Sequence, residues 1–285
     1  IPKSFASLRR IEEILEAEIE IKEETIQTVA KPSFAQTNAA AFEHVTFKYT
    51  ETSDPVLEDI DFTIPKGKTT AIVGGTGSGK SSLAKLLLRL SDPTVGKVTL
   101  GGIPLTQMTQ EQIRSHISYV PQKAFLFSGT ILSNLQMGNE HALPEELAKA
   151  IKIAQLEELV DTLPDGLDSF VAQGGSNYSG GQKQRICIAR ALIKPAEIYV
   201  FDDSFSALDY KTDAALRAAL HKHMSEKTLV IVAQRLSTIQ QADNIIVLDE
   251  GKVVGKGTHN ELLKNCEVYK QIALSQLSKE ELENE

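Results

Sequence analysis

The feature that most restricts the fold is a glycine-rich run, GGTGSGKSS, which covers residues 74–82. It follows TTAIV, a short β-branched segment typical of a strand, and it leads into KSSLAKLLLRL, whose leucines recur at helical spacing. A strand, a glycine loop and a helix in this order match the G-x-x-x-x-G-K-[ST] pattern. The run is therefore predicted to be a phosphate-binding loop. A plain glycine turn at the end of a strand is the alternative interpretation.

Each residue type in this loop has a physical reason to meet a phosphate group. Glycines let consecutive backbone amides point inward, where Cβ atoms would obstruct them, and the helix adds the positive end of its dipole. Lys80 is predicted to reach the β and γ phosphates, and the Ser81 hydroxyl to coordinate Mg²⁺. The predicted phosphate-binding residues are Gly75, Thr76, Gly77, Ser78, Gly79, Lys80, Ser81 and Ser82.

A magnesium nucleotide site also needs a carboxylate at the end of a neighbouring strand, and the segment IYVFDD supplies one. Asp202 is the predicted Mg²⁺ ligand. Asp203 follows it directly and is the candidate to lie next to an attacking water. An acidic pair that only caps a strand in solvent is the other interpretation. The phosphate loop upstream favours the metal site.

The order of the predicted elements indicates an α/β domain. AFEHVTFKY and VLEDIDFTI are predicted strands, and after Ser179 helices alternate with the strands EIYVFDD, TLVIVA and NIIVLD, as in a parallel sheet with crossover helices. Between these parts, helical periodicity predicts an inserted helical subdomain at about 109–190. A Pro, Ser, Gln, Thr and Ala rich stretch predicts a linker at 31–40. The main domain is then expected at 41–264, with a C-terminal helical tail at 265–285.

Composition narrows the possible partners. The formal net charge of -8 has the wrong sign for nonspecific attraction to nucleic acid, so no nucleic-acid partner is expected. The two cysteines stand far apart and outside any metal-ligand spacing, which is typical of a reduced cytoplasmic protein. The chain contains no apolar run long enough to cross a bilayer.

The segment NYSGGQKQRICIARAL, residues 177–192, strongly resembles the signature sequence of ATP-binding cassette (ABC) proteins. The resemblance implies a P-loop NTPase of the ABC type, with a RecA-like core, an antiparallel β subdomain and an inserted α-helical subdomain. It also implies that the cofactors are ATP and Mg²⁺. In this family two nucleotide-binding domains pair head to tail, and each ATP lies between one phosphate loop and the partner's signature. Here the signature residues are Ser179, Gly180, Gly181 and Gln182.

Three further residues match positions with known roles in the family. Tyr49 corresponds to the aromatic residue that stacks on adenine, and a core tyrosine is the alternative. Gln122, in YVPQ, corresponds to a glutamine that contacts Mg²⁺ beside the transmembrane partner, and an exposed loop amide is the alternative. Asp209, in SALD, corresponds to a residue that crosses the dimer interface. Asp209 is also placed to cap the helix that follows, and both interpretations can hold together.

The stretch FLFSGTILSNL resembles ABC exporters in particular, where this region receives the coupling helices of a membrane domain. The amphipathic start, with Leu8, Ile11, Ile14 and Leu15 on one face, fits the same resemblance. Residues 1–30 are expected to be the end of a transmembrane-domain helix and the start of a linker. The chain is then expected to work on the cytoplasmic face of a membrane, joined to a transmembrane domain.

The chain departs from the family pattern at two catalytic positions. Asp203 stands where efficient family members carry Glu, which sets the carboxylate back by roughly 1.5 Å. A displacement near 1 Å can cost about a hundredfold in rate. Gln234 stands where the family has His, and an amide cannot bring positive charge to a developing anion.

This pair of changes resembles the degenerate site of heterodimeric multidrug exporters. The resemblance implies weak ATPase activity for the isolated chain, and a partner chain that carries the usual Glu and His. The expected cargo is a lipophilic or drug-like molecule. The alternatives are a soluble ATPase of the same superfamily that acts on DNA or ribosomes, and a regulatory nucleotide-binding module without turnover.

Overall fold

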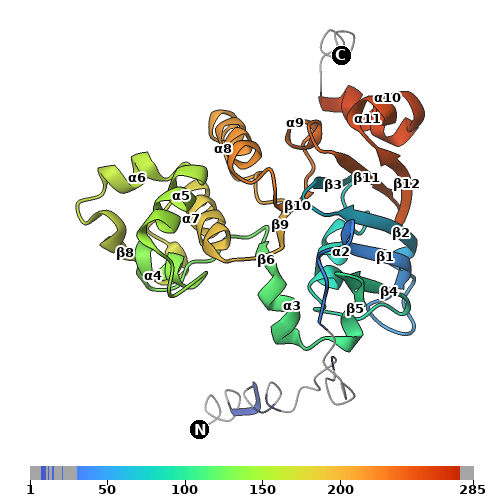
Figure 1. Cartoon of the computed structure of the whole chain (residues 1–285), viewed down its shortest axis with the longest axis horizontal. Helices are drawn as coiled ribbons and strands as arrows, with labels where there is room; N and C mark the ends of the chain where they lie inside the picture. The colour runs from blue at the N-terminus through green and yellow to red at the C-terminus, as the bar shows by residue number, and fades with distance from the viewer. Residues whose placement is uncertain (1–7, 11, 13–14, 16–20, 22–30, 277–285) are drawn as a thin grey trace.

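The computed structural model describes residues 8–10, 12, 15, 21 and 31–276. Most of the predicted N-terminal amphipathic helix, including Ile11 and Ile14, lies outside the described residues, and so does 277–285 of the predicted tail. Figure 1 shows a sheet-rich part, which contains the phosphate loop and the C-terminal helices, and a group of helices to one side of it.

Each strand and helix is defined by its bounds. The strands are β1 (Asn38–Phe47), β2 (Leu57–Pro65), β3 (Thr69–Gly74), β4 (Val95–Leu100), β5 (Ile103–Pro104), β6 (Ile117–Val120), β7 (Gly129–Thr130), β8 (Phe170–Val171), β9 (Ile198–Asp202), β10 (Thr228–Val232), β11 (Asn244–Asp249) and β12 (Lys252–Gly257). The helices are α2 (Lys80–Leu87), α3 (Gln110–His116), α4 (Ile131–Gln136), α5 (Pro144–Ile153), α6 (Glu157–Thr162), α7 (Gly180–Ile193), α8 (Tyr210–His223), α9 (Leu236–Ile239), α10 (His259–Asn265) and α11 (Glu267–Gln276).

The central sheet has the strand order β12-β11-β3-β10-β9-β6, in which β12 alone runs antiparallel to its neighbour. Alternate residues of each strand point to opposite faces. Tyr199 and Phe201 of β9 therefore join one apolar core, which includes residues of α7, α8 and α11. Ile198 and Val200 join a second core on the other face, which includes residues of α2.

A second sheet, in the order β2-β1-β4-β5, is antiparallel and contributes its apolar side chains to the same core as α2. The phosphate loop connects β3 to α2, as the sequence predicts. The predicted α/β fold, with a RecA-like sheet, an antiparallel β subdomain and inserted helices, is confirmed. The strands β4 and β6, and the two-residue strands β5, β7 and β8, are not apparent from the sequence pattern.

The helical group comprises α4, α5, α6 and α7 and stands beside the central sheet in Figure 1. The helical group begins later in the chain than the predicted residue 109. α3 precedes β6, and β6 pairs in parallel with β9, so this part of the chain belongs to the central sheet. The difference arises because the short strand ISYV lies between two helical patterns and is too brief to show a period of its own.

Both ends of the main domain also extend further than predicted. β1 begins at Asn38, inside the predicted linker, because Ala39 and Ala40 are buried against the sheet rather than exposed in a connection. At the other end, α11 lies in the predicted tail but buries Tyr269 and Ala273, one helical turn apart, in the core. Within the described residues, no helix combines the length and the apolar character required to span a membrane.

Candidate functional site

A pocket of about 310 Å³ opens at the carboxyl ends of β3, β9 and β10. These strands are neighbours in the parallel part of the sheet, so their ends and the loops that follow them meet at one edge. The pocket is lined by Val56, Thr76, Gly77, Gly79, Lys80, Ser81, Ser82, Gln122, Asp202, Asp203, Val232 and Gln234. Most of the predicted phosphate, metal and catalytic residues therefore surround one cavity.

The phosphate loop is shaped by glycines in the left-handed region. Gly77 has φ 80° and Gly79 has φ 100°, values that other residues rarely adopt. A Cβ at Gly79 would also lie 2.5 Å from Cδ2 of Leu57 and 3.1 Å from the Val56 carbonyl oxygen, so a larger residue would add crowding to the unfavourable backbone angle. This backbone places Gly79 directly before the first residue of α2, and it brings the start of the helix to the pocket.

Lys80 is 8% exposed, and its ammonium group lies inside the curve of the loop. The Nζ donates hydrogen bonds to the carbonyl oxygens of Gly74, at 2.9 Å, and Gly75, at 2.6 Å. Burial lowers the pKa of Lys80, although the charges of Asp203 and Asp202 act to raise it. A positive group held at the base of a glycine loop is suited to bind a polyphosphate.

Asp202 is the most buried carboxylate of this pocket, at 5% exposure. Its Oδ2 accepts a 3.0 Å hydrogen bond from the hydroxyl of Tyr119, whereas its Oδ1 is buried without a partner among the described residues. Burial raises the pKa of Asp202 above its usual value, against the lowering effect of the Tyr119 hydrogen bond. A buried carboxylate oxygen without a partner, in a pocket that also contains Ser81, fits a hard cation such as Mg²⁺.

Asp203 directs its carboxylate at two side-chain amides. Its Oδ2 accepts a 2.9 Å hydrogen bond from Nε2 of Gln122 and a 3.3 Å hydrogen bond from Nε2 of Gln234. Its φ is 46°, an uncommon value for a residue other than glycine, and its backbone amide donates to the Val232 carbonyl at 2.8 Å. The three residues predicted to be catalytic are therefore in direct contact.

Tyr49 lies at the edge of the pocket, joined to it by a 3.0 Å hydrogen bond between its hydroxyl and Oγ of Ser82. Its side chain is 51% exposed, so the interpretation as a core tyrosine is wrong. Phe47 packs edge-on against the ring, and Nζ of Lys85 lies 5.3 Å from the ring centroid. An exposed aromatic ring beside a phosphate loop is a suitable surface for a nucleobase.

The signature residues are not part of the pocket lining. Ser179 begins α7 in the helical group (Figure 1), where its Oγ accepts from the amide of Gln182 at 3.2 Å. The side chain of Gln182 accepts in turn from the Ser179 amide, which completes a capping box. Ser179 and Gly180 are exposed, and Gly181, the second residue of the helix, is half-buried. The α7 N-terminus is therefore open to solvent and does not line the pocket of this chain's own phosphate loop.

Asp209 caps α8, as one of its two interpretations predicts. Its carboxylate accepts a 3.0 Å hydrogen bond from the backbone amide of Thr212 and a 2.7 Å hydrogen bond from the Thr212 hydroxyl. These bonds, the amide first, lower the pKa of Asp209. The role of Asp209 at a dimer interface stays a prediction.

Comparison with known proteins decides the family. The family model described as ABC transporter matches residues 57–206, which include the phosphate loop, the signature and both aspartates. This chain belongs to the ABC transporter family. It is an ATP-binding ATPase domain of that family, and the recognition of an ABC exporter nucleotide-binding domain from the sequence is confirmed.

Relatives of this ABC domain are about twice its length. An uncharacterized ABC transporter ATP-binding protein of Mycobacterium tuberculosis is 46% identical over 86% of this chain and 42% of its own length. A probable multidrug resistance ABC transporter ATP-binding/permease protein, YheI of Bacillus subtilis, is 40% identical over 93% of this chain and 45% of its own. The chain thus spans less than half the length of these curated relatives.

A solved structure supports the same family assignment. The structure of a bacterial Atm1-family ABC exporter with ATP bound superimposes on this ABC domain with a TM-score of 0.88 and 32% sequence identity. The match covers 98% of this chain and 48% of the exporter chain.

One residue at the site of this ABC domain is not predicted from the sequence. Tyr119 contacts Asp202, but it lies on β6, the short strand that the sequence pattern does not reveal. The one available signal was its position three residues before Gln122, in the segment YVPQ. Val56 and Val232, which also line the pocket, carry no sequence signal for this role.

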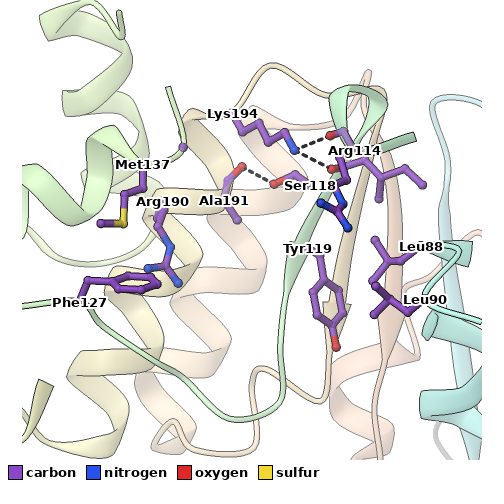
Figure 2. Close-up of a pocket in the computed structure, with 12 residues that line it drawn as sticks. Leu88, Leu90, Arg114, Ser118, Tyr119, Phe127, Met137, Arg190, Ala191 and Lys194 are labelled. Carbon is purple, nitrogen blue, oxygen red and sulfur yellow. Dashed lines mark hydrogen bonds between the residues drawn. The ribbon is translucent and has the colours of Figure 1, made fainter. Parts of the chain in front are cut away.

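A second cavity of the ABC domain, a groove of about 390 Å³, lies between the helical group and the central sheet (Figure 2). Its lining includes the exposed apolar side chains of Phe127 and Met137 on one side and of Leu90 on the other. Lys194 reaches across the upper end and donates to the carbonyl oxygens of Arg114 and, at 3.1 Å, of Ile117. The groove is therefore apolar, with basic side chains at its margin.

Proposed function

We propose that this chain is the motor domain of an ABC exporter, that it binds ATP with Mg²⁺, and that each ATP is shared with a second nucleotide-binding domain. One observation carries this proposal. The phosphate loop and the acidic pair line one pocket, whereas the signature residues lie elsewhere on the same chain. A second domain is therefore needed to bring a signature to this pocket.

The residues of the pocket divide into nucleotide and metal contacts. The loop from Gly75 to Ser82 surrounds the phosphates, with Lys80 as the cation that contacts the β and γ groups. Tyr49 stacks on the adenine ring. Ser81, Gln122 and Asp202 hold Mg²⁺, which would neutralise phosphate charge when bound.

The second half of each site comes from the partner domain. The exposed N-terminus of α7 offers the hydroxyl of Ser179 and the amides of Gly180 and Gly181 to an anion. Because it is open to solvent and does not line this chain's pocket, it is available to the nucleotide of the partner. Gln182 fixes this terminus through the capping box. Asp209 is proposed to cross the interface between the two domains.

The site on this chain is proposed to turn over slowly. A general base must have a free oxygen within hydrogen-bond reach of the attacking water. One oxygen of Asp203 is already engaged by the amides of Gln122 and Gln234, and its side chain is shorter than Glu. The proposed native partner is a different chain that carries Glu and His at these two positions and receives this chain's intact signature.

A transmembrane domain of the same exporter is the proposed second partner. The groove beside Phe127 and Met137, and the neighbouring exposed Phe125, offer an apolar surface to a membrane domain's cytoplasmic helices. The chain would then work on the cytoplasmic face of the membrane. A lipophilic or drug-like cargo is proposed, in line with the multidrug resistance name of the relative from Bacillus subtilis.

Size measurement of the 285-residue chain with and without MgATP tests the shared site. The chain carries both a phosphate-loop pocket and a signature, so two copies can complete each other's ATP sites. Light scattering after size exclusion should therefore show an ATP-dependent dimer. Slow turnover should make this dimer long-lived. The variant Lys80→Ala should stay monomeric because its loop no longer holds phosphate. Lys97→Ala changes an exposed residue of β4 that does not line the pocket, and it should dimerise normally.

Two results would contradict the proposal. A chain that stays monomeric while saturated with MgATP would contradict the sharing of ATP between two copies of this domain. Fast steady-state phosphate release by the unmodified chain, abolished in Lys80→Ala, would show that the Asp203 site is catalytically competent.

A further inference from the structure

Tyr119 lies between the nucleotide pocket and the groove of Figure 2. It is on β6, where it pairs in parallel with Val200 of β9. Side chains two residues apart on a strand share one face, so Asp202 projects on the same face as Val200. This register brings the hydroxyl of Tyr119 to 3.0 Å from Oδ2 of Asp202.

The ring of Tyr119 is held by apolar packing. It is half-buried and contacts the core on the α2 face of the sheet. Figure 2 shows the ring beside Leu88 and Leu90, with its hydroxyl directed away from the Lys194 end of the groove. A rigid ring fixed along its length places the hydroxyl without a large loss of side-chain entropy.

The two oxygens of Asp202 have different surroundings. Oδ2 accepts the tyrosine hydroxyl, and the Ser81 hydroxyl lies close enough to the carboxylate to lower its pKa, whereas Oδ1 is buried without a hydrogen bond of normal geometry among the described residues. A hydrogen bond to one oxygen restrains rotation of the carboxylate plane. The oxygen that is left without a partner belongs to a side chain that lines the same pocket as Ser81 and Lys80.

We propose that Tyr119 is a positioning residue for the magnesium-binding carboxylate of Asp202. Its hydroxyl holds Oδ2 and thereby leaves Oδ1 as the oxygen offered to the metal. The inference rests on the proposed function, since Asp202 binds a metal only if the pocket takes a magnesium nucleotide. Loss of such a supporting hydrogen bond typically lowers metal affinity about 10- to 100-fold.

The variant Tyr119→Phe in the full chain tests this role, because it removes the hydroxyl and keeps the ring. Calorimetric titration with a non-hydrolysable ATP analogue, once with Mg²⁺ and once with EDTA, measures how much the metal improves nucleotide affinity. We expect this improvement to fall on the order of tenfold, with the metal-free affinity unchanged.

Tyr199→Phe is the matched control. Tyr199 lies on the same strand as Asp202, and its hydroxyl donates a 2.8 Å hydrogen bond to the Lys194 carbonyl oxygen. The control therefore removes a tyrosine hydroxyl from the same sheet without touching the carboxylate. It should lower thermal stability and leave the metal-dependent improvement at the wild-type value.

The outcomes separate this inference from the proposed function. If Mg²⁺ improves the nucleotide affinity of Tyr119→Phe as much as that of the wild type, the positioning role is overturned. An equal loss of affinity with Mg²⁺ and with EDTA would also overturn it, because it would show that Tyr119 only shapes the pocket. No improvement by Mg²⁺ in the wild-type chain would contradict the proposed function itself.

Discussion

The side-chain amide of Gln122 donates a 2.9 Å hydrogen bond to Oδ2 of Asp203. Gln234 donates to the same oxygen at 3.3 Å, so the carboxylate best placed to activate a water is already an acceptor for two amides. Both amides lie in loops at the edge of the pocket, and both are neutral donors. Their convergence gives the proposed slow site a structural basis beyond the shorter side chain.

Lengthening the acidic side chain at position 203 should raise the rate of ATP hydrolysis. Asp203→Glu extends the side chain by one carbon-carbon bond, about 1.5 Å, and restores the carboxylate length of the family pattern. Together with Gln234→His, we expect phosphate release to rise by up to about a hundredfold. The rise should disappear when Lys80→Ala is added.

Asp161→Glu on α6 is the control for the added methylene group, since this residue is exposed and outside the pocket. It should leave turnover unchanged. If Asp203→Glu with Gln234→His turns over no faster than the wild-type chain, the length of the carboxylate is not what limits the site.

Tyr49 should contribute to nucleotide affinity through its ring and not through its hydroxyl. Tyr49→Ala removes a stacking surface worth about 1–3 kcal/mol per base, so ATP affinity should fall roughly 5- to 150-fold. Tyr49→Phe loses only the hydrogen bonds of the hydroxyl with Ser82 and Lys85 and should stay within about threefold of the wild type. Fluorescence titration with ATP and GTP measures both effects.

Stacking does not discriminate between bases, so Tyr49→Ala should weaken ATP and GTP binding alike. A loss in Tyr49→Phe as large as in Tyr49→Ala would contradict stacking. It would assign the role to the hydroxyl contact with the phosphate-loop helix.

Ser179 should contribute to ATP-dependent dimerisation and not to nucleotide binding by the monomer. Ser179→Ala removes a hydroxyl that lies outside the pocket, so the affinity of the monomer for MgATP should not change. ATP-dependent dimerisation should weaken, because a donor to the partner's phosphate is lost. Monomer affinity by calorimetry and dimer formation by sedimentation separate the two effects.

Thr109→Ala is a close control for the capping role of Ser179. Thr109 caps α3 through the same capping box, with its hydroxyl 3.2 Å from the amide of Gln112. Each substitution should cost about 1 kcal/mol of stability. Equal weakening of the dimer in both variants would show that helix stability, and not the signature hydroxyl, is responsible.

Asp209 should make stability depend on pH. Hydrogen bonds from the Thr212 amide and hydroxyl lower the pKa of Asp209 in the folded state. A lowered folded-state pKa contributes stability above the usual aspartate value of about 3.9, and this contribution is lost as pH falls through the lowered value. Asp209→Asn keeps a capping oxygen but not the charge, so it should unfold at a lower temperature than the wild type at neutral pH.

The gap between these two melting temperatures should close on acidification below about pH 4. Thermal unfolding followed by circular dichroism across this range measures it. A gap that is constant or widens in acid would show that the charge of Asp209 does not stabilise the cap.

The sequence alone determines the parts of this protein that depend on neighbouring residues. The phosphate loop was predictable because strand, turn and helix are contiguous, and because glycines in the left-handed region leave few alternatives for the backbone from Gly74 to Ser82. The cap at Asp209 was predictable for the same reason, since its partner Thr212 is three residues away. The family followed from the signature segment, which is also continuous.

Only the tertiary structure decides which distant side chains meet. The contacts of Tyr119 with Asp202 and of Gln122 with Asp203 depend on β6 lying next to β9 in a given register, and a strand as short as ISYV has no detectable period. Gln234 reaches Asp203 because β10 is the other neighbour of β9. Strand order and register are set by burial across the whole sheet, so no local stretch of sequence contains this information.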